Sequence, residues 1–224
     1  MLSKLSILIP TRKRPKQLRE VLENLRDNVE YRPLHVEVGF DGDEDGARGF
    51  GWSIFDRDFP GSVYFFARGE YISTVNNLAR IAYSRKTAYF MPWSDDSYLL
   101  GHRPLCRAID ALNANSGLQA GNKPCLLAMN NPYWGYRLAT HAILNREMVD
   151  WLNYGGGAIF YPGYKHYAGD NELTALAKRD GYFYFLESVR VEHPPPTETQ
   201  ENPSMKWKKH DREVWLERKE EMDL

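Results

Sequence analysis

The sequence predicts an α/β protein with a mainly parallel sheet flanked by helices. Short apolar runs typical of buried strands alternate with longer segments whose apolar residues recur every three or four positions, as they do in amphipathic helices. Polar and acidic residues follow several of the predicted strands. Strand–helix alternation of this kind indicates a parallel sheet that binds ligands at the carboxyl ends of its strands.

The first half of the chain carries most of this alternation. Residues 5–9 form an apolar run that Pro10 and Thr11 close, and Pro15 suits the first turn of the helix that follows. A third short run is expected to form a strand at 63–66, after a glycine-rich irregular segment at 46–61. The remaining elements predicted here are helices at 15–28 and 73–84 and strands at 34–40 and 87–91.

The second half is less regular. It predicts helices at 104–113, 146–152 and 171–180, and strands at 125–129, 139–144, 182–185 and 189–191. Long loops at 154–157 and 161–164 interrupt it, and loops of this kind are often functional. Beyond Pro194-Pro195-Pro196 the chain is highly charged, and the spacing of Trp207, Val214 and Trp215 predicts one amphipathic helix.

Length and composition narrow the protein class. The 224 residues suffice for one domain, and the 42% hydrophobic and 26% charged residues are ordinary for a soluble protein. A net charge of −1 gives no global attraction to nucleic acid or anionic lipid. Two cysteines give no disulfide framework, and no apolar run is long enough to span a bilayer. We therefore expect a cytoplasmic protein.

Two adjacent carboxylates, Asp95 and Asp96, stand just after the predicted strand at 87–91. Hard oxygen donors at a strand end suit Mn²⁺ or Mg²⁺, which take their remaining ligands from water and phosphates. This arrangement points to a nucleoside diphosphate bound through a metal. Acidic pairs after strands are also common turn formers.

Six motifs in order resemble the family 2 glycosyltransferases, which have the GT-A nucleotide-sugar fold. They are the Pro-Thr-x-x-Arg-Pro segment at 10–15, the Asp-Gly-Asp turn at 41–43, the Ser-Thr-Val-Asn-Asn segment at 73–77, Ser94-Asp95-Asp96, Gly169-Asp170-Asn171-Glu172-Leu173 and Val191-Glu192-His193. The resemblance implies a GT-A domain at 1–196, with a nucleotide-sugar half at 1–100 and an acceptor half at 101–196. Residues 197–224 then form a charged, helical C-terminal tail.

The chain departs from the family pattern at four places. Arg12 stands where the family usually has Tyr, Ser94 replaces the first Asp of its metal motif, and Leu78-Ala79 lacks the usual Gly. Gly169 replaces the usual Glu. The last change leaves Asp170 as the sole acidic residue at the presumed general base.

The resemblance assigns roles to the matching positions. Asp96 and His193 would hold a divalent cation, Mn²⁺ or Mg²⁺, on the diphosphate, and Asp170 would deprotonate the acceptor hydroxyl, with inversion as the expected outcome. A carboxylate at Asp41 would favour a uridine or thymidine donor. The full set expected at the nucleotide sugar is Pro10, Thr11, Arg12, Arg14, Asp41, Arg68, Asn77 and Asp95. Each of three residues could instead have a structural role. Asp170 could be a helix N-cap, Asp41 could form a turn, and His193 could bond to the backbone.

The acceptor is not identified by the sequence. Trp134, Tyr136 and Tyr164 lie in the expected acceptor half, where aromatic rings can stack on sugars or only pack loops together. Glu172 is a supporting candidate. A glycan, a lipid-linked glycan, a small molecule and a DNA base all remain possible acceptors.

Three other functions compete with glycosyl transfer. A nucleotidyltransferase is expected to have a glycine-rich phosphate loop after its first strand, and residues 11–15 contain no glycine. An inactive sugar- or nucleotide-binding module is compatible with Gly169. A DNA-base glycosyltransferase would use Lys206, Lys208 and Lys209 on phosphates, with strongly salt-dependent binding.

Overall fold

The computed structural model describes residues 4–28, 30–31, 34–42, 54–116, 123–193 and 206–224. Its strands are β1 (Leu5–Thr11), β2 (Leu34–Asp41), β3 (Gly61–Phe66), β4 (Tyr89–Pro92), β5 (Tyr98–Leu100), β6 (Leu126–Asn130), β7 (Ala142–Asn145) and β8 (Phe183–Glu192). The helices are α1 (Pro15–Asp27), α3 (Glu70–Ser84), α4 (Pro104–Ser116), α5 (Arg146–Leu152), α6 (Gly169–Arg179) and α7 (Lys208–Glu221), with a 3₁₀ turn, η2 (Gly135–Arg137).

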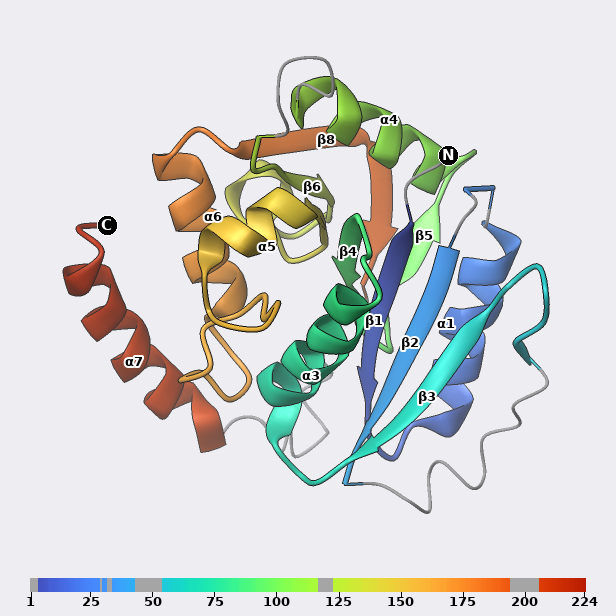
Figure 1. The fold of residues 1–224 in the computed structure, drawn as a ribbon, viewed down its shortest axis with the longest axis horizontal. Helices are drawn as coiled ribbons and strands as arrows, with labels where there is room; N and C mark the ends of the chain where they lie inside the picture. The colour runs from blue at the N-terminus through green and yellow to red at the C-terminus, as the bar shows by residue number, and fades with distance from the viewer. Residues whose placement is uncertain (1–3, 29, 32–33, 43–53, 117–122, 194–205) are drawn as a thin grey trace.

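All eight of these strands join one mixed sheet in the order β3-β2-β1-β4-β7-β6-β8-β5 (Figure 1). The four strands β3, β2, β1 and β4 are parallel to their neighbours within this group. Beyond them, β7 runs antiparallel to both β4 and β6, and β5 runs antiparallel to β8. In the second half of the chain, β6 and β8 form one further parallel pair. The predicted α/β class with a mainly parallel sheet is confirmed.

Helices cover both faces of the sheet, and the alternation within β1 shows why. Ile7 and Ile9 pack into the core under α1 and α4, whereas Leu8 points into the core under α3, α5 and α6. Strand side chains alternate between faces, so a parallel strand buried on both faces must be apolar throughout. All seven residues of β1 are buried accordingly.

Close packing of α3 onto the sheet requires a glycine in β2. A Cβ atom at Gly39 would lie 2.9 Å from the Thr74 side chain and 3.2 Å from that of Leu78. Any larger residue at this position would push α3 away from β2.

Several element boundaries differ from the prediction. The helix expected from Ser73 begins at Glu70, the two short strands expected at 182–185 and 189–191 form the single strand β8, and β5 was not predicted. The helix expected from Asn171 begins at Gly169, so Asp170 lies inside its first turn. The N-cap is Ala168, and the N-cap alternative for Asp170 is wrong.

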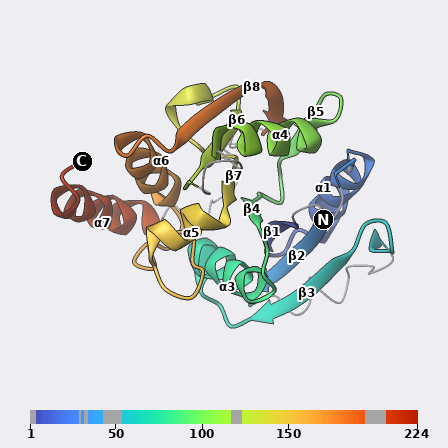
Figure 2. The same ribbon diagram turned by 45° about the horizontal axis from the view of Figure 1, so that its top comes forward.

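The charged tail contains the predicted helix, α7, which lies beside α6 and away from β1–β3 (Figures 1 and 2). Its partly buried Val214 and Trp215 pack against the core formed under α3, α5 and α6. Asp43, residues 46–53 of the glycine-rich segment expected at 46–61, and the three prolines at 194–196 lie outside the described residues. No helix among the described residues is long and apolar enough to cross a membrane.

Candidate active site

The residues predicted to bind the donor lie where the parallel strands end. Thr11 is the last residue of β1, Asp41 is the last of β2, and Asp95 and Asp96 follow β4. Because β1 is paired in parallel with both β2 and β4, these three ends meet at one edge of the sheet. Ligands of open α/β sheets bind at this edge.

Asp95 is buried and held by two residues of the first strand–helix connection. Thr11 Oγ1 donates to Asp95 Oδ2 over 2.7 Å, and an Arg14 guanidinium nitrogen lies 3.1 Å from Asp95 Oδ1. Burial raises the pKa of Asp95 to about 6, although Arg14 and Thr11 act in the opposite direction. Thr11 and Arg14 therefore favour the ionised form of this buried carboxylate.

Asp96 receives a different set of contacts. His193 Nε2 lies 3.1 Å from Asp96 Oδ1, Arg14 lies 3.4 Å from Oδ2, and the Ser94 hydroxyl donates to Oδ1. Burial would raise the pKa of Asp96, but the hydrogen bonds from His193 and Ser94 outweigh it and lower the pKa to about 2. Asp96 is thus the more acidic of the two carboxylates.

Strand pairing brings His193 to this place from far along the chain. Tyr98 of β5 pairs with Glu192 of β8, so the residue after β8 lies beside the turn before β5, which contains Asp96. The ring of the buried His141 packs 5.5 Å from the His193 ring, and His141 Nε2 lies 2.8 Å from the Ser97 hydroxyl. Burial lowers the pKa of His141 to about 3, and repulsion from the nearby His193 contributes to this shift. The His141 ring is therefore neutral and supports the His193 ring by packing.

Asp96 and His193 fit a divalent cation. Adjacent ligands at about 2.1 Å from an octahedral Mg²⁺-like ion lie about 3 Å apart, and the Asp96–His193 separation of 3.1 Å matches this edge. The described residues contain no group of three or more His, Cys, Asp or Glu side chains around a metal position. A cation held here would take its remaining ligands from phosphate and water, as Mg²⁺ usually does.

Asp170 lies in the first turn of α6 and lines a small, partly open cavity of about 60 Å³. Part of its surface is accessible, yet burial in this cavity raises the pKa of its carboxyl, against the opposing effect of backbone N–H groups. The polar lining of the cavity comes from Tyr71, Thr140, His166 and Asp170. A carboxylate with a raised pKa in a small cavity is a suitable general base.

Tyr71 and His166 are site residues that the sequence analysis did not select. Burial raises the pKa of Tyr71, and repulsion from Asp170, Asp96 and Asp95 adds to it, which places Tyr71 in the field of all three carboxylates. Its ring lies 5.4 Å from that of His166. The cavity beside Asp170 therefore adjoins the Asp95–Asp96 pair.

The remaining donor candidates have varied surroundings. Asp41 is buried, and its Oδ1 accepts the Gly69 N–H over 2.7 Å, so one carboxylate oxygen secures the start of α3. Pro10 is buried inside β1, and Arg12 Nε is a buried donor with no acceptor among the described residues. A guanidinium with an unpaired Nε among the described residues, beside Thr11, suits an anionic ligand.

Arg68 and Asn77 each make a polar contact with a residue close by in the sequence. Arg68 pairs with Glu70 over 3.2 Å, next to the turn at Gly42, where a Cβ atom would lie 2.9 Å from the Arg68 side chain. Asn77 accepts a hydrogen bond from Arg80. Within the described ranges, no hydrogen bond or ion pair joins either residue to Asp95 or Asp96.

The four acceptor candidates divide into two exposed and two buried residues. Trp134 and Tyr136 are 48% and 66% exposed on the segment that contains η2. Tyr164 and Glu172 are buried, and the Tyr164 hydroxyl donates to Glu172 Oε2 over 2.6 Å. Glu172 also pairs with Arg218 at 3.0 Å. Through these contacts the buried pair links α6, which contains Glu172, to the loop that contains Tyr164 and to α7, which contains Arg218.

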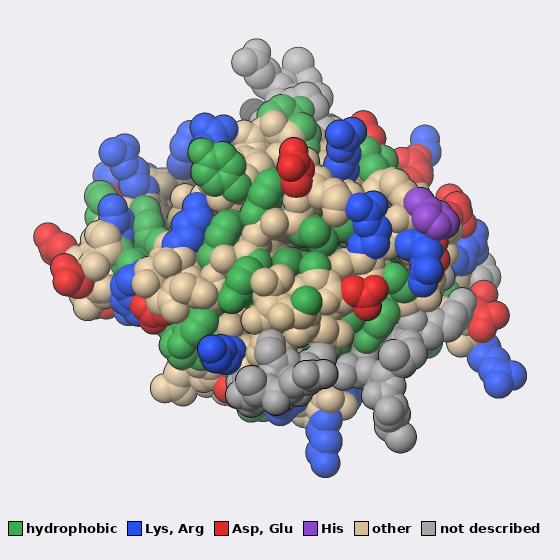
Figure 3. Space-filling view, turned by 90° about the horizontal axis from the view of Figure 1, so that it is seen from above, with side chains coloured by type: hydrophobic (Ala, Val, Ile, Leu, Met, Phe, Trp, Pro, Cys, Tyr) green, Lys and Arg blue, Asp and Glu red, His purple; other side chains and the backbone are tan. Residues whose placement is uncertain are grey.

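The surface carries both signs of charge. In the view of Figure 3, Lys and Arg side chains are interspersed with Asp and Glu, and no single-sign patch dominates this face. Lys206 pairs with Glu70 over 3.2 Å, and Lys209 lies near Glu213. Two of the three lysines that a DNA-binding face would need are thus paired with carboxylates.

Solved glycosyltransferases share this fold. Staphylococcus aureus TarS superposes with a TM-score of 0.65 at 14% identity, covering 84% of this chain and 36% of that chain. The mannosyltransferase PcManGT from Pyrobaculum calidifontis, in complex with GDP-Man and Mn²⁺, gives 0.65 at 16% identity, covering 87% and 58%. TarS 1-349 in complex with UDP-GlcNAc gives 0.64 at 13% identity, covering 88% and 60%.

The chain has a GT-A-type fold. It spans between about a third and three fifths of the length of these three structures. No family model matches its sequence, and no curated protein matches it either. The structural likeness therefore establishes the fold, and the site geometry must carry the argument for activity.

Proposed function

We propose that this protein is a metal-dependent glycosyltransferase of the family 2 kind, which moves a sugar from a nucleoside diphosphate to an acceptor hydroxyl. The observation that carries the proposal is the approach of Asp96 and His193 to 3.1 Å at the carboxyl edge of a GT-A-type sheet. The two residues lie far apart in the sequence and are brought together by the pairing of β5 with β8. Their meeting at the diphosphate edge, next to Asp170, supports a donor site and not a simple turn.

The donor diphosphate is proposed to lie between the cation ligands and the first strand–helix connection. Mn²⁺ or Mg²⁺ held by Asp96 and His193 would neutralise charge on the leaving diphosphate. Arg12, whose Nε has no hydrogen-bond partner in the described part of the chain, and Arg14 add positive charge on the same side. Asp95, fixed by Thr11 and Arg14, is positioned to accept from sugar hydroxyls.

The base of the nucleotide is proposed to meet the ends of β1 and β2. Asp41 Oδ1 is occupied by the Gly69 N–H, which leaves Oδ2 to accept from a ring N–H. A pyrimidine with an N–H next to carbonyls, uracil or thymine, presents such a donor. One neighbour binds UDP-GlcNAc and another binds GDP-Man, so both nucleotides belong in the first panel.

Asp170 is proposed to take the proton of the acceptor hydroxyl. The raised pKa of its carboxyl strengthens it as a base compared with an exposed aspartate. A single base and a cation-bound leaving group favour direct displacement with inversion at the anomeric carbon. Trp134 and Tyr136 are exposed aromatic faces on which an acceptor sugar can stack.

The proposal is tested with a panel of nucleotide sugars and Mn²⁺, with and without EDTA, for wild type and Asp96→Ala. We expect metal-dependent release of one nucleoside diphosphate, abolished by Asp96→Ala and unchanged by Asp58→Ala, an exposed carboxylate before β3. Binding of a nucleotide sugar without turnover, also in the presence of glycan acceptors, would favour an inactive binding module. Absence of binding across the panel would refute the donor site.

A further inference from the structure

Asp211, on the C-terminal helix α7, is a fully buried carboxylate that accepts three successive backbone N–H groups. Its Oδ1 accepts from Lys165 over 2.9 Å, and its Oδ2 accepts from His166 over 2.9 Å and from Tyr167 over 2.7 Å. Hydrogen bonds to a charged acceptor are about twice as strong as neutral ones. A buried carboxylate satisfied in this way fixes the backbone that surrounds it.

The backbone that Asp211 holds belongs to the wall of the cavity beside Asp170. His166 lines this cavity and packs on Tyr71, and the Lys165 carbonyl accepts the N–H of Ile72, which also lines it. Asp170 follows a few residues later, after Ala168, whose φ of 67° turns the chain into α6. Asp211 thus connects α7 to both sides of the cavity.

A second group of contacts secures α7 to the same region. Arg218 pairs with the buried Glu172 of α6 at 3.0 Å and lies 4.2 Å from the centre of the Tyr161 ring. His210 Nε2 lies 3.1 Å from the Gly163 carbonyl oxygen. The helix is therefore attached to the 161–167 loop and to α6, the two segments that carry His166 and Asp170.

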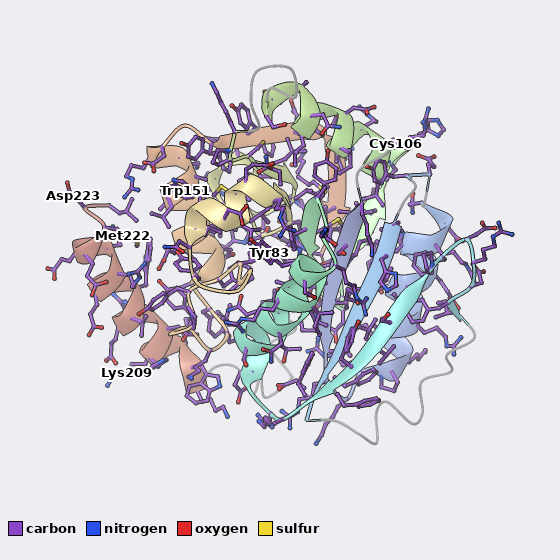
Figure 4. All side chains as sticks on the ribbon, in the orientation of Figure 1. Tyr83, Cys106, Trp151, Lys209, Met222 and Asp223 are labelled. Carbon is purple, nitrogen blue, oxygen red and sulfur yellow. The ribbon has the colours of Figure 1, made fainter. Side chains whose placement is uncertain are left out.

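A surface helix can dock through apolar side chains alone, whereas α7 also makes these polar contacts with the loop and with α6. The opposite side of α7 is exposed, and Leu216 is 55% accessible. In Figure 4, Lys209 is labelled near the start of the helix and Asp223 just beyond its end. Burying a carboxylate beneath the helix is costly unless its hydrogen bonds are kept. The arrangement ties the geometry of residues 165–167 to the presence of α7.

We propose that Asp211 is a positioning residue for the transfer reaction. It holds residues 165–167 so that His166 and Tyr71 shape the cavity in which Asp170 meets the acceptor hydroxyl. This inference rests on the proposed function of Asp170. It makes α7 part of the catalytic unit, although the helix contributes no group to the reacting atoms.

The test compares Asp211→Asn with Glu213→Gln, which makes the same carboxylate-to-amide change at an exposed position of the same helix. We expect kcat to fall by about 10- to 100-fold in Asp211→Asn, because misplacement by about 1 Å near a reacting group has effects of this size. The KM for the nucleotide sugar is expected to stay within about twofold, since Asp96 and His193 are untouched. Glu213→Gln is expected to match wild type.

Amide hydrogen exchange of peptides covering 163–168 provides a readout that does not depend on turnover. Faster exchange in Asp211→Asn, with β1 and β4 peptides unchanged, supports the proposal. Unchanged exchange or unchanged kcat would overturn it. If wild type turns over no donor, the proposed function fails, and the exchange data still decide whether Asp211 holds the loop.

A milder variant covers the case in which Asp211→Asn does not fold. His210→Ala removes the contact with the Gly163 carbonyl oxygen, the 4.0 Å approach of His210 Nε2 to Asp211 Oδ1 and the ring contact with Trp207, and it leaves the Asp211 carboxylate itself in place. We expect faster exchange at 163–168 and a smaller loss of kcat than in Asp211→Asn, with donor KM unchanged. A variant that exchanges and turns over like wild type would count against the role of α7.

Discussion

The Nε2 atom of His193 lies 3.1 Å from Oδ1 of Asp96, although the two residues follow different strands in distant parts of the sequence. The pairing of β5 with β8 creates this proximity. It places a nitrogen and an oxygen ligand at the edge where the parallel strands end. The remaining site residues can be understood by their position relative to this pair.

Replacement of His193 should weaken donor binding only when metal is present. In His193→Ala we expect the Kd of the nucleoside diphosphate with Mn²⁺ to rise at least about tenfold, a loss of roughly 1.4 kcal/mol. Without metal, the two proteins should bind equally weakly. Titration calorimetry measures both values, and His102→Ala, at a histidine whose side chain is 88% exposed, is the control. Equal weakening with and without metal would contradict a ligand role.

Replacement of Asp170 should separate binding from chemistry. Asp170→Asn keeps the shape of the side chain but removes the base, so we expect kcat to fall by about 10²–10⁴-fold with donor affinity retained. Asp180→Asn, at the far end of α6 and paired with Arg179, is the matched control. Steady-state kinetics with saturating donor measure the effect. A loss of less than about threefold would remove Asp170 from the mechanism.

The pH dependence of transfer should follow the raised pKa of Asp170. A general base works only when deprotonated, so the rate is expected to fall as pH drops through the folded-state pKa. Because burial raises this pKa, the acid limb should lie above the usual aspartate value of about 4. The profile of kcat at saturating donor and metal tests this. An acid limb at or below pH 4 would show that the carboxyl is not perturbed.

Replacement of Asn76 and of Asn77, at adjacent positions of α3, should affect the free energy of unfolding to different extents. The buried Asn76 accepts the N–H groups of Ile159 and Phe160, each over 3.0 Å, and donates to the Phe160 carbonyl over 2.8 Å. Asn76→Ala leaves these groups unpaired, so we expect the free energy of unfolding to fall by about 2–4 kcal/mol.

Asn77 is half-buried and bonds only to Arg80 among the hydrogen bonds of the described residues. Asn77→Ala should therefore cost less than about 1 kcal/mol. Urea unfolding of both variants checks the pair. Similar losses in the two would mean that the contact of Asn76 with the 159–160 backbone contributes little to stability.

The strand ends of this fold could be predicted from sequence because their signals are local. The apolar runs before Thr11, Asp41 and Asp95 mark where strands stop, and parallel pairing brings such ends together. The position of His193 beside Asp96 was expected from the family resemblance and depends on a long-range strand pairing that periodicity does not reveal. β5 was not predicted, since it is only three residues long, and the strand expected at 139–144 is observed as the shorter β7.

Two other residues near the site were not predicted, one because a helix begins earlier than expected and one because its contacts are with a loop distant in the sequence. Tyr71 precedes the predicted helix start at Ser73, whereas α3 begins at Glu70. The φ of 67° at Glu70 is uncommon for a residue other than glycine. Asp211 lies in a charged segment in which the sequence predicts an amphipathic helix through Trp207, Val214 and Trp215, and Asp211 is not part of that apolar pattern. Its burial depends on three backbone groups of a distant loop, and no sequence pattern reports such a contact.

The most direct test of the account is a pulsed electron paramagnetic resonance measurement of Mn²⁺ bound with a nucleoside diphosphate. A histidine ligand couples its ¹⁴N nucleus to the metal electrons. We predict this coupling in wild type and in the His102→Ala control, and its loss in His193→Gln. The absence of bound Mn²⁺ in wild type, or a ¹⁴N coupling that persists in His193→Gln, would contradict the assignment of Asp96 and His193 as the ligands of the donor metal.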